Sequence, residues 1–289
     1  MKNKKSILMT LCLFACLFAF PGKCLAQTSK DNVAEMPWKQ TEDITDGEWK
    51  GFQVKSFPLE HFTVQIAFPH NHLEGKPWTF LIGALNGYHN EINEKLLKSG
   101  VGVVAVNIYN VFGSEYGLNL MDKIYDIVHN DFGFSRKCCL YGVSRAGLSV
   151  YNWALRHLKL ISCIYCEGPV LDFKTWPMKW KPSAKHWKDL KKLYGFSSDE
   201  EAIAYKGNPI DNLKPIADAK IPIRHVISLT SKHDTQTVPN EKNTLKAKRI
   251  FAQYGHSIDI AIIPEGQIKP PYGFDDESVS FIVNNCRLF

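Results

Sequence analysis

The chain has 289 residues, with 35 lysine and arginine residues against 29 acidic ones, which gives a net charge of +6 at pH 7. Four of those lysines and no acidic residue stand in the first 26 positions, so the remainder carries only +2 (31 − 29). Such a small charge excludes the basic composition typical of nucleic-acid-binding proteins. The remaining length is enough for one large α/β domain with a sizeable core.

The first 26 residues have the pattern of a secretory signal peptide. A lysine-rich start precedes an apolar run over 7–20, and small residues around Ala26 offer a cleavage site. The run is shorter than the roughly 20 apolar residues that span a bilayer. We therefore expect cleavage near Ala26 and export to the periplasm or beyond. A loose lead-in over 27–47 and one domain over 48–289 would follow.

Apolar runs and helical periodicity predict alternating strands and helices along the domain. The expected strands are 62–68, 78–84, 101–107, 137–142, 160–166, 221–229 and 258–263. The expected helices between and after them are 116–129, 148–158, 243–254 and 276–285. This alternation predicts an α/β fold with a mostly parallel central sheet and helices on both faces.

Residues 168–217 interrupt the alternation, and we call this segment the lid. Its sequence predicts helices over 183–194 and 198–205, with Ser198 and Glu201 forming a capping box at the start of the second. An insertion of this length between two strands usually covers the mouth of an active site.

The lid alternates tryptophans with lysines. Trp176 and Trp180 are candidates for stacking on sugar rings, beside lysines that suit acidic groups on a glycan. The alternative is an amphipathic helix with buried tryptophans and a solvated basic face, and this alternative is favoured for Trp187.

Five cysteines follow the expected signal peptide, and four of them stand in expected central strands, where thiols act as small hydrophobes. Cys163 and Cys166 resemble a redox or zinc pair in spacing. On a strand, however, residues three apart point to opposite faces. His70 and His72 have no carboxylate or cysteine beside them and are interpreted as loop residues rather than metal ligands. We therefore expect no cofactor and no metal, while a disulfide between neighbouring strands stays open.

The segment Gly142-Val-Ser-Arg-Ala-Gly147 stands where an apolar strand meets a helix. In a nucleophile elbow, the sharp turn forces the serine into a strained backbone and demands small residues two positions away on each side. Gly142 and Ala146 meet that demand. The sequence therefore predicts Ser144 as a nucleophile, with the amide of Arg145 as an oxyanion donor.

Four segments resemble secreted α/β hydrolases of Bacteroidetes and Planctomycetes: 142–154, 168–177, 204–213 and Val111-Phe-Gly-Ser114. The resemblance covers roughly residues 75–285. It implies an α/β-hydrolase fold and a serine esterase of the prolyl-oligopeptidase or acetyl-xylan-esterase type, of a kind often used in polysaccharide breakdown.

In the family that the chain resembles, the triad acid follows the strand matching 222–229, in Gly-Asp-x-Asp-x-x-Val-Pro. Here the acid's usual position falls on Thr235, and Asp234 stands one residue away. Asp234 is therefore one candidate acid. Glu167, at the end of the preceding strand, is the other, because some hydrolases of this fold supply the acid there.

The triad histidine should follow the last strand, but residues 264–272 contain none. His256 precedes that strand and lies at the wrong end of the sheet. His233, beside Asp234, is on the correct side and is the candidate base from a neighbouring loop. A serine without a nearby base is barely nucleophilic at neutral pH.

The second oxyanion donor is expected in the segment after the strand 78–84. The amide of Gly87 or Tyr88 is the candidate, and His89 is a candidate pocket residue.

Two hypotheses follow. The first is a serine carboxylic-ester hydrolase whose substrate is a small-molecule or glycan ester on a decorated polysaccharide or oligosaccharide. The second is a catalytically inactive relative that binds a glycan or a partner. The elbow favours the first hypothesis and the missing histidine the second; the enzyme is the preferred interpretation.

Overall fold

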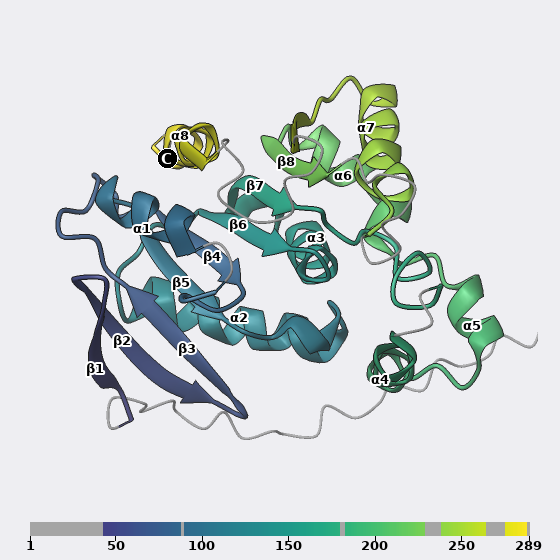
Figure 1. Ribbon diagram of the computed structural model, residues 1–289, viewed down its shortest axis with the longest axis horizontal. Coiled ribbons are helices and arrows are strands. Elements are labelled where there is room, and N and C mark those ends of the chain that lie inside the picture. Colours follow the sequence, from purple (N-terminus) through teal and green to yellow (C-terminus); the bar gives the residue numbers. More distant parts are fainter. Residues whose placement is uncertain (1–42, 88–89, 180–182, 229–237, 264–274, 288–289) are drawn as a thin grey trace, which may run out of the picture. The chain divides into compact units, whose positions relative to one another are not determined.

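The computed structural model describes residues 43–87, 90–179, 183–228, 238–263 and 275–287. Within these residues one sheet has nine strands in the order β1-β2-β3-β5-β4-β6-β7-β8-β9 (Figure 1). Their bounds are β1 Thr45–Trp49, β2 Phe52–Leu59, β3 Phe62–Ala67, β4 Trp78–Ile82, β5 Gly102–Val106, β6 Cys138–Val143, β7 Ile161–Glu167, β8 Ile223–Ser228 and β9 Asp259–Ile263.

Helices lie on both faces of this sheet. Their bounds are α1 Asn90–Lys98, α2 Glu115–Asn130, α3 Ala146–Arg156, α4 Ala184–Tyr194, α5 Asp199–Ala204, α6 Lys214–Asp218, α7 Thr244–Gln253 and α8 Asp275–Cys286. Short 3₁₀ helices are η2 Tyr109–Val111, η3 Leu158–Leu160, η5 Pro209–Asp211 and η6 Asn240–Lys242. None of the described helices is long and apolar enough to cross a membrane.

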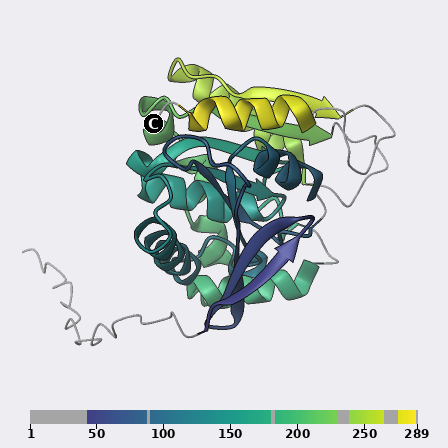
Figure 2. The same cartoon turned by 90° about the vertical axis from the view of Figure 1, so that its left-hand side faces the viewer.

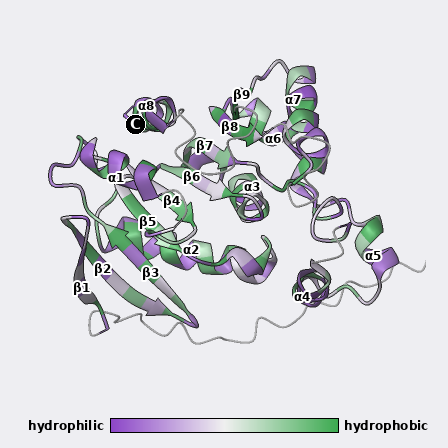
Figure 3. Cartoon of the chain, viewed as in Figure 1, coloured by the Kyte–Doolittle hydropathy of each residue, from purple (hydrophilic) through white to green (hydrophobic). Residues whose placement is uncertain are grey.

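Six neighbouring strands, from β5 through β4 and β6 to β9, are mutually parallel, while β1, β2 and β3 pair antiparallel at one edge. Every residue of β4 and β5 is buried. Apolar side chains on one face pack against α1 and α8, and those on the other pack against α2 and α3. The view of Figure 2 shows α8 lying along the sheet, and Figure 3 shows hydrophobic residues along the central strands. The predicted parallel sheet, covered on both faces, is confirmed.

Among the described strands and α-helices, four were not predicted from the sequence: β1, β2, α1 and the short helix α6. β1 begins at Thr45, before the expected domain start at residue 48, and four of its five residues are exposed, so no apolar pattern marks it. β2 alternates buried and exposed residues only at its ends. α1 is nine residues long and is polar except for a narrow stripe that includes Ile92, Leu96 and Leu97.

The cysteines follow the strand geometry. Cys163 packs in the apolar core with α1 and α8, whereas Cys166 packs in the core on the opposite face. The predicted opposite orientation of these two residues is confirmed. All five cysteines of the domain are buried free thiols in this structure.

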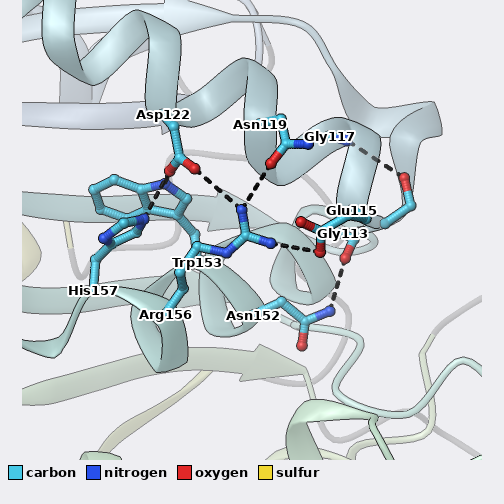
Figure 4. Close-up of polar contacts among 10 residues, drawn as sticks. Gly113, Glu115, Gly117, Asn119, Asp122, Asn152, Trp153, Arg156 and His157 are labelled. Carbon is cyan, nitrogen blue, oxygen red and sulfur yellow. Dashed lines mark hydrogen bonds and ion pairs between the residues drawn. The ribbon is translucent and has the colours of Figure 1, made fainter. Parts of the chain in front are cut away.

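Helix α3 carries the candidate nucleophile turn at its start, and its other end is held to α2 by Asp122 (Figure 4). The Asp122 carboxylate accepts hydrogen bonds from Trp153 Nε1 at 2.7 Å and from Arg156 Nη1 at 3.1 Å. His157 Nε2 lies 2.7 Å from the same carboxylate. From the middle of α3, Asn152 donates to the carbonyl oxygen of Gly113, just before α2, at 2.9 Å. These contacts fix the direction in which α3 leaves the sheet.

We predict that Asp122→Leu lowers the free energy of unfolding by about 1–3 kcal/mol, because it leaves the indole N–H of the buried Trp153 without its acceptor and removes one of the acceptors of Arg156. Urea unfolding would measure this. Asp126→Leu, at the next turn of the same helix, is the control, since Asp126 is exposed and should shift the midpoint much less. Equal shifts in the two variants would contradict the role given to Asp122.

A buried histidine joins three elements on the α3 face of the sheet. His225 of β8 is fully buried, with Nε2 2.7 Å from the Tyr151 hydroxyl of α3 and Nδ1 3.0 Å from Thr244 Oγ1 of α7. Burial lowers the pKa of His225 from 6.5 to about 3, so the ring is neutral in the folded protein at neutral pH.

This lowered pKa predicts a pH dependence of stability. Between about pH 6.5 and pH 3 the unfolded chain binds a proton at residue 225 that the folded chain does not, so stability falls as the pH falls. The contribution approaches 1.4 kcal/mol per pH unit below pH 6. Chemical unfolding at pH 7, 6 and 5 should show a shallower slope for His225→Gln than for the parent, whatever the variant's absolute stability. An unchanged slope would contradict the buried neutral ring.

Candidate active site

The loops after the parallel strands meet at one edge of the sheet, because those strands all end on the same side. β6 ends at Val143 and α3 begins at Ala146, so Ser144 lies in the short turn between them. Its φ is 54°, in the left-handed region that non-glycine residues rarely adopt. Strained residues of this kind cluster at functional sites. Ser144 thus has the backbone expected of an elbow nucleophile.

Three backbone hydrogen bonds hold this turn. The Ser144 amide donates to the carbonyl oxygen of Glu167 at 2.8 Å. The Ser144 carbonyl oxygen accepts from the amides of Gly147 at 3.0 Å and Val170 at 2.9 Å. Glu167 ends β7 and Val170 begins the lid, so the neighbouring strand and the segment after it offset a backbone strain of about 1–3 kcal/mol.

Close packing explains the glycines around the serine. A Cβ at Gly142 would lie 2.7 Å from Val150 Cγ2 and 3.2 Å from the Cβ of Ala146. A Cβ at Gly147 would lie 2.6 Å from Pro169 Cβ and 2.8 Å from the carbonyl oxygen of Val170. The elbow therefore has no room for larger side chains, whereas the methyl group of Ala146 fits in the buried interior of the turn.

Glu167 is 5% exposed, at the carboxyl end of β7 beside the elbow. Hydroxyl groups of Tyr141 and Tyr165 donate to its Oε1 at 3.1 and 2.9 Å. Burial and the adjacent Glu167 carboxylate raise the pKa of both tyrosines well above the usual value, so both hydroxyls stay protonated donors. The structure thus places this candidate acid next to Ser144 in the sheet, and its part in a triad stays a prediction.

The two described candidates for oxyanion donors, the amides of Arg145 and Gly87, differ in whether a hydrogen bond already occupies them. The Arg145 amide lies at the N-terminus of α3, where the first N–H groups have no partner inside the helix. This is the position expected of a donor to a bound oxyanion. The Gly87 amide instead donates to the carbonyl oxygen of Ala84 at 3.0 Å, in the turn after β4. As an oxyanion donor it would first have to release that hydrogen bond.

Several predicted site residues lie outside the described residues: Tyr88, His89, Trp180, His233 and Asp234. Their roles stay predictions. The segment 264–274, in which a triad histidine is missing from the sequence, also lies outside them.

The described residues on either side of 229–237 locate the ends of the segment that carries His233 and Asp234. β8 ends at Ser228, at the same edge of the sheet as the elbow, and Asn240 donates to the Ser228 carbonyl oxygen at 2.6 Å. Val238 is buried in an apolar cluster with Leu148, in the first turn of α3, and Val170, whose amide donates to the Ser144 carbonyl oxygen. The segment therefore leaves and rejoins the described chain beside the candidate site.

The Arg145 side chain is the centre of a cluster that the sequence did not predict. Its Nη1 donates to Asn110 Oδ1 at 2.8 Å and lies 3.3 Å from His186 Nε2. The guanidinium lies over the rings of Trp176 at 5.1 Å and Tyr109 at 6.0 Å. Tyr109 and Asn110 follow β5, and His186 comes from α4 of the lid. Tyr109 and Asn110 could have been predicted as site residues, because polar residues that directly follow a buried parallel strand lie at the carboxyl edge of the sheet.

Trp176 lies beside Arg145 of the elbow, but the residue is only 7% exposed. It packs against Phe112 and His186 as well as Arg145. Most of its surface is therefore occupied by protein, which leaves little of the ring for stacking on a sugar.

In the second lid helix, Ser198 Oγ accepts from the Glu201 amide as predicted, but the Glu201 carboxylate accepts from the amide of Ser197 rather than from that of Ser198.

A cavity of about 290 Å³ lies at the same edge of the sheet, across β4 and β5. Its lining includes Gly83 and Ala84 after β4, Asn107 after β5, and Gln65 of β3. The Tyr109 hydroxyl lies close to Gly83, since a Cβ at Gly83 would come within 2.8 Å of it. The cavity thus lies beside the loop where a second oxyanion donor is expected.

Of the other described histidines, His61 lines this cavity, whereas His256, His70 and His72 lie elsewhere. His256 Nε2 is 2.9 Å from the carbonyl oxygen of Ile221, before β8, so it lies at the sheet edge opposite the elbow, as predicted. His70 stacks on Phe52, and His72 meets Phe68 edge to face. Within the ranges that the structure describes, no three His, Cys, Asp or Glu side chains are grouped to hold a metal.

No family model matches the chain, and no curated protein matches its sequence. The fold is similar to that of MPT51 of Mycobacterium tuberculosis, with 13% identity over 78% of this chain and 94% of that one, and a TM-score of 0.57. An S-formylglutathione hydrolase from Agrobacterium tumefaciens matches with 12% identity over 84% of this chain and 99% of its own, and a TM-score of 0.57. A puromycin-hydrolyzing peptidase of Mycobacterium tuberculosis matches with 13% identity over 83% of this chain and 40% of its own, and a TM-score of 0.62. The chain has the α/β-hydrolase fold.

We predict that Gly147→Ala destabilises the protein by about 1–3 kcal/mol, because the new methyl group meets the carbonyl oxygen of Val170, which cannot rotate away. Gly47→Ala in β1 is the control, since the nearest atom to its Cβ is 3.9 Å away. Thermal unfolding of both variants would measure the difference. A Gly147→Ala protein as stable as Gly47→Ala would contradict the close approach of the lid to the elbow.

Proposed function

We propose that this protein is an exported serine hydrolase of carboxylic esters, with Ser144 as nucleophile and the Arg145 amide as an oxyanion donor. The observation that carries the proposal is the left-handed backbone of Ser144 at φ 54°, held by Glu167, Gly147 and Val170. A strained serine turn at the carboxyl edge of a parallel sheet presents a hydroxyl group to bound substrate. An ordinary strand-to-helix turn has no need of this conformation.

The base and the acid complete the proposal. His233 is the proposed base and Asp234 or Glu167 the proposed acid. The supporting observations are that Ser228 and Val238, the described residues on either side of 229–237, lie at the edge of the sheet that carries the elbow, and that Glu167 ends the adjacent strand. In such a triad the base takes the serine proton and passes it to the leaving alcohol, while the acid orients the base.

We further propose that the substrate is an ester on a decorated polysaccharide or oligosaccharide. The apolar run that follows a basic start supports export. The resemblance of segments 142–154, 168–177 and 204–213 to secreted polysaccharide esterases supports the substrate class. The lysine-rich sequence of the lid, which suits acidic groups on a glycan, also supports it.

We predict that a fluorophosphonate probe labels the protein at Ser144 and that Ser144→Ala abolishes labelling. Removal of one triad member costs at least about a thousandfold in rate, so His233→Ala should slow labelling by at least that factor. His256→Ala is the matched control, because His256 lies at the opposite edge of the sheet. Mass spectrometry of the labelled peptide would identify the serine.

Asp234→Asn and Glu167→Gln assign the acid, since only the variant that loses the true acid should slow labelling strongly. An unlabelled parent protein at neutral pH would contradict the enzyme and favour the second hypothesis, a hydrolase fold kept for binding a glycan or partner.

A further inference from the structure

The Arg145 guanidinium is a half-buried cation for which the described residues provide no acidic partner. Its polar neighbours among them are the amide oxygen of Asn110 and the ring nitrogen of His186, both neutral. None of the ion pairs of the described residues includes Arg145. A cation removed from water without a counter-charge is costly. A bound anion would remove that cost.

The geometry leaves one edge of the guanidinium available. Arginine has five N–H donors, and the two on Nη1 face Asn110 and His186. No acceptor for Nε or Nη2 occurs among the described residues. These two nitrogens form the side-on fork that binds a carboxylate with two parallel hydrogen bonds. Because Nη1 is held and Trp176 covers the plane at 5.1 Å, the fork is fixed before a ligand arrives.

His186 is the second polar partner of the guanidinium, and it supplies no counter-charge. Arginine can only donate, so His186 Nε2 accepts from Arg145 and the ring hydrogen is on Nδ1. That Nδ1 is buried and has no hydrogen-bond partner among the described residues. Burial and the Arg145 charge lower the pKa of His186 and keep the ring neutral.

From these contacts we infer that Arg145, flanked by Trp176 and His186, binds a carboxylate group that the substrate carries near its scissile ester. Arg145 directly follows Ser144 in the chain, so its side chain starts beside the nucleophile. The inference rests on the proposed function and adds a substrate class to it, namely esters that themselves carry a negatively charged carboxylate. Arg145 has two separate parts in the site, because its amide serves the oxyanion and its side chain serves the carboxylate.

The test compares two esters with matched chains. 4-Nitrophenyl hydrogen succinate carries a terminal carboxylate, and 4-nitrophenyl butyrate carries a methyl group in its place. The selectivity is the kcat/KM for the succinate divided by that for the butyrate. We expect Arg145→Gln to lower this selectivity roughly 10- to 100-fold, since a charge-assisted bidentate contact is lost. Arg145→Lys should lose part of it, because lysine keeps the charge without the fork.

Lys188→Gln is the matched control, since it removes the same charge from an exposed position on α4, the helix of His186. Its selectivity should equal that of the parent. Circular dichroism of each variant checks that the fold is kept. Selectivity unchanged in Arg145→Gln, with both esters hydrolysed, would overturn the carboxylate site and leave the esterase intact.

A direct binding measurement separates this inference from the proposed function. Succinate is titrated into full-length Ser144→Ala protein by calorimetry, which needs no catalysis. Binding that Arg145→Gln weakens at least about tenfold, and Lys188→Gln does not, supports the site even if neither ester is hydrolysed. Equal binding to the Arg145→Gln and Arg145 proteins, or none to either, overturns it.

Discussion

The left-handed backbone of Ser144 is the constraint on which the site depends. A serine at φ 54° is stable only because Glu167, Gly147 and Val170 hydrogen-bond to its peptide groups. Those three residues come from the neighbouring strand, from the first turn of α3 and from the start of the lid. The turn therefore links the sheet, the helix and the lid at one point. At the far end of α3, Asp122 fixes the helix against α2 and so keeps the turn in place.

The central sheet could be predicted because its buried strands appear in the sequence as runs of apolar residues. Continuous apolar runs such as 101–107 mark strands covered on both faces, and each expected strand and helix occurs with its ends shifted by at most two residues. β1 could not be predicted, since four of its five residues face solvent and its only signal is pairing with β2. α1 is short and mostly polar, so its apolar stripe was too narrow to detect.

The candidate site was predictable only where a motif fixes the backbone. Ser144 and the small residues around it follow from the steric needs of the elbow, and the structure agrees with them. The environment of the Arg145 side chain did not follow, because Asn110 and His186 come from two separate segments that only the fold brings together. Burial of Trp176 was left open for the same reason: a sequence pattern shows that a tryptophan is present but not which neighbours cover it.

The central claim is that Ser144 is activated by a base, and the most direct measurement is a crystal structure of the protein phosphonylated at Ser144. We expect an imidazole nitrogen of His233 within about 2.6–3.2 Å of the serine oxygen or a phosphonyl oxygen. Every histidine more than about 8 Å from the serine oxygen, well beyond hydrogen-bond reach, would contradict a triad mechanism for this chain.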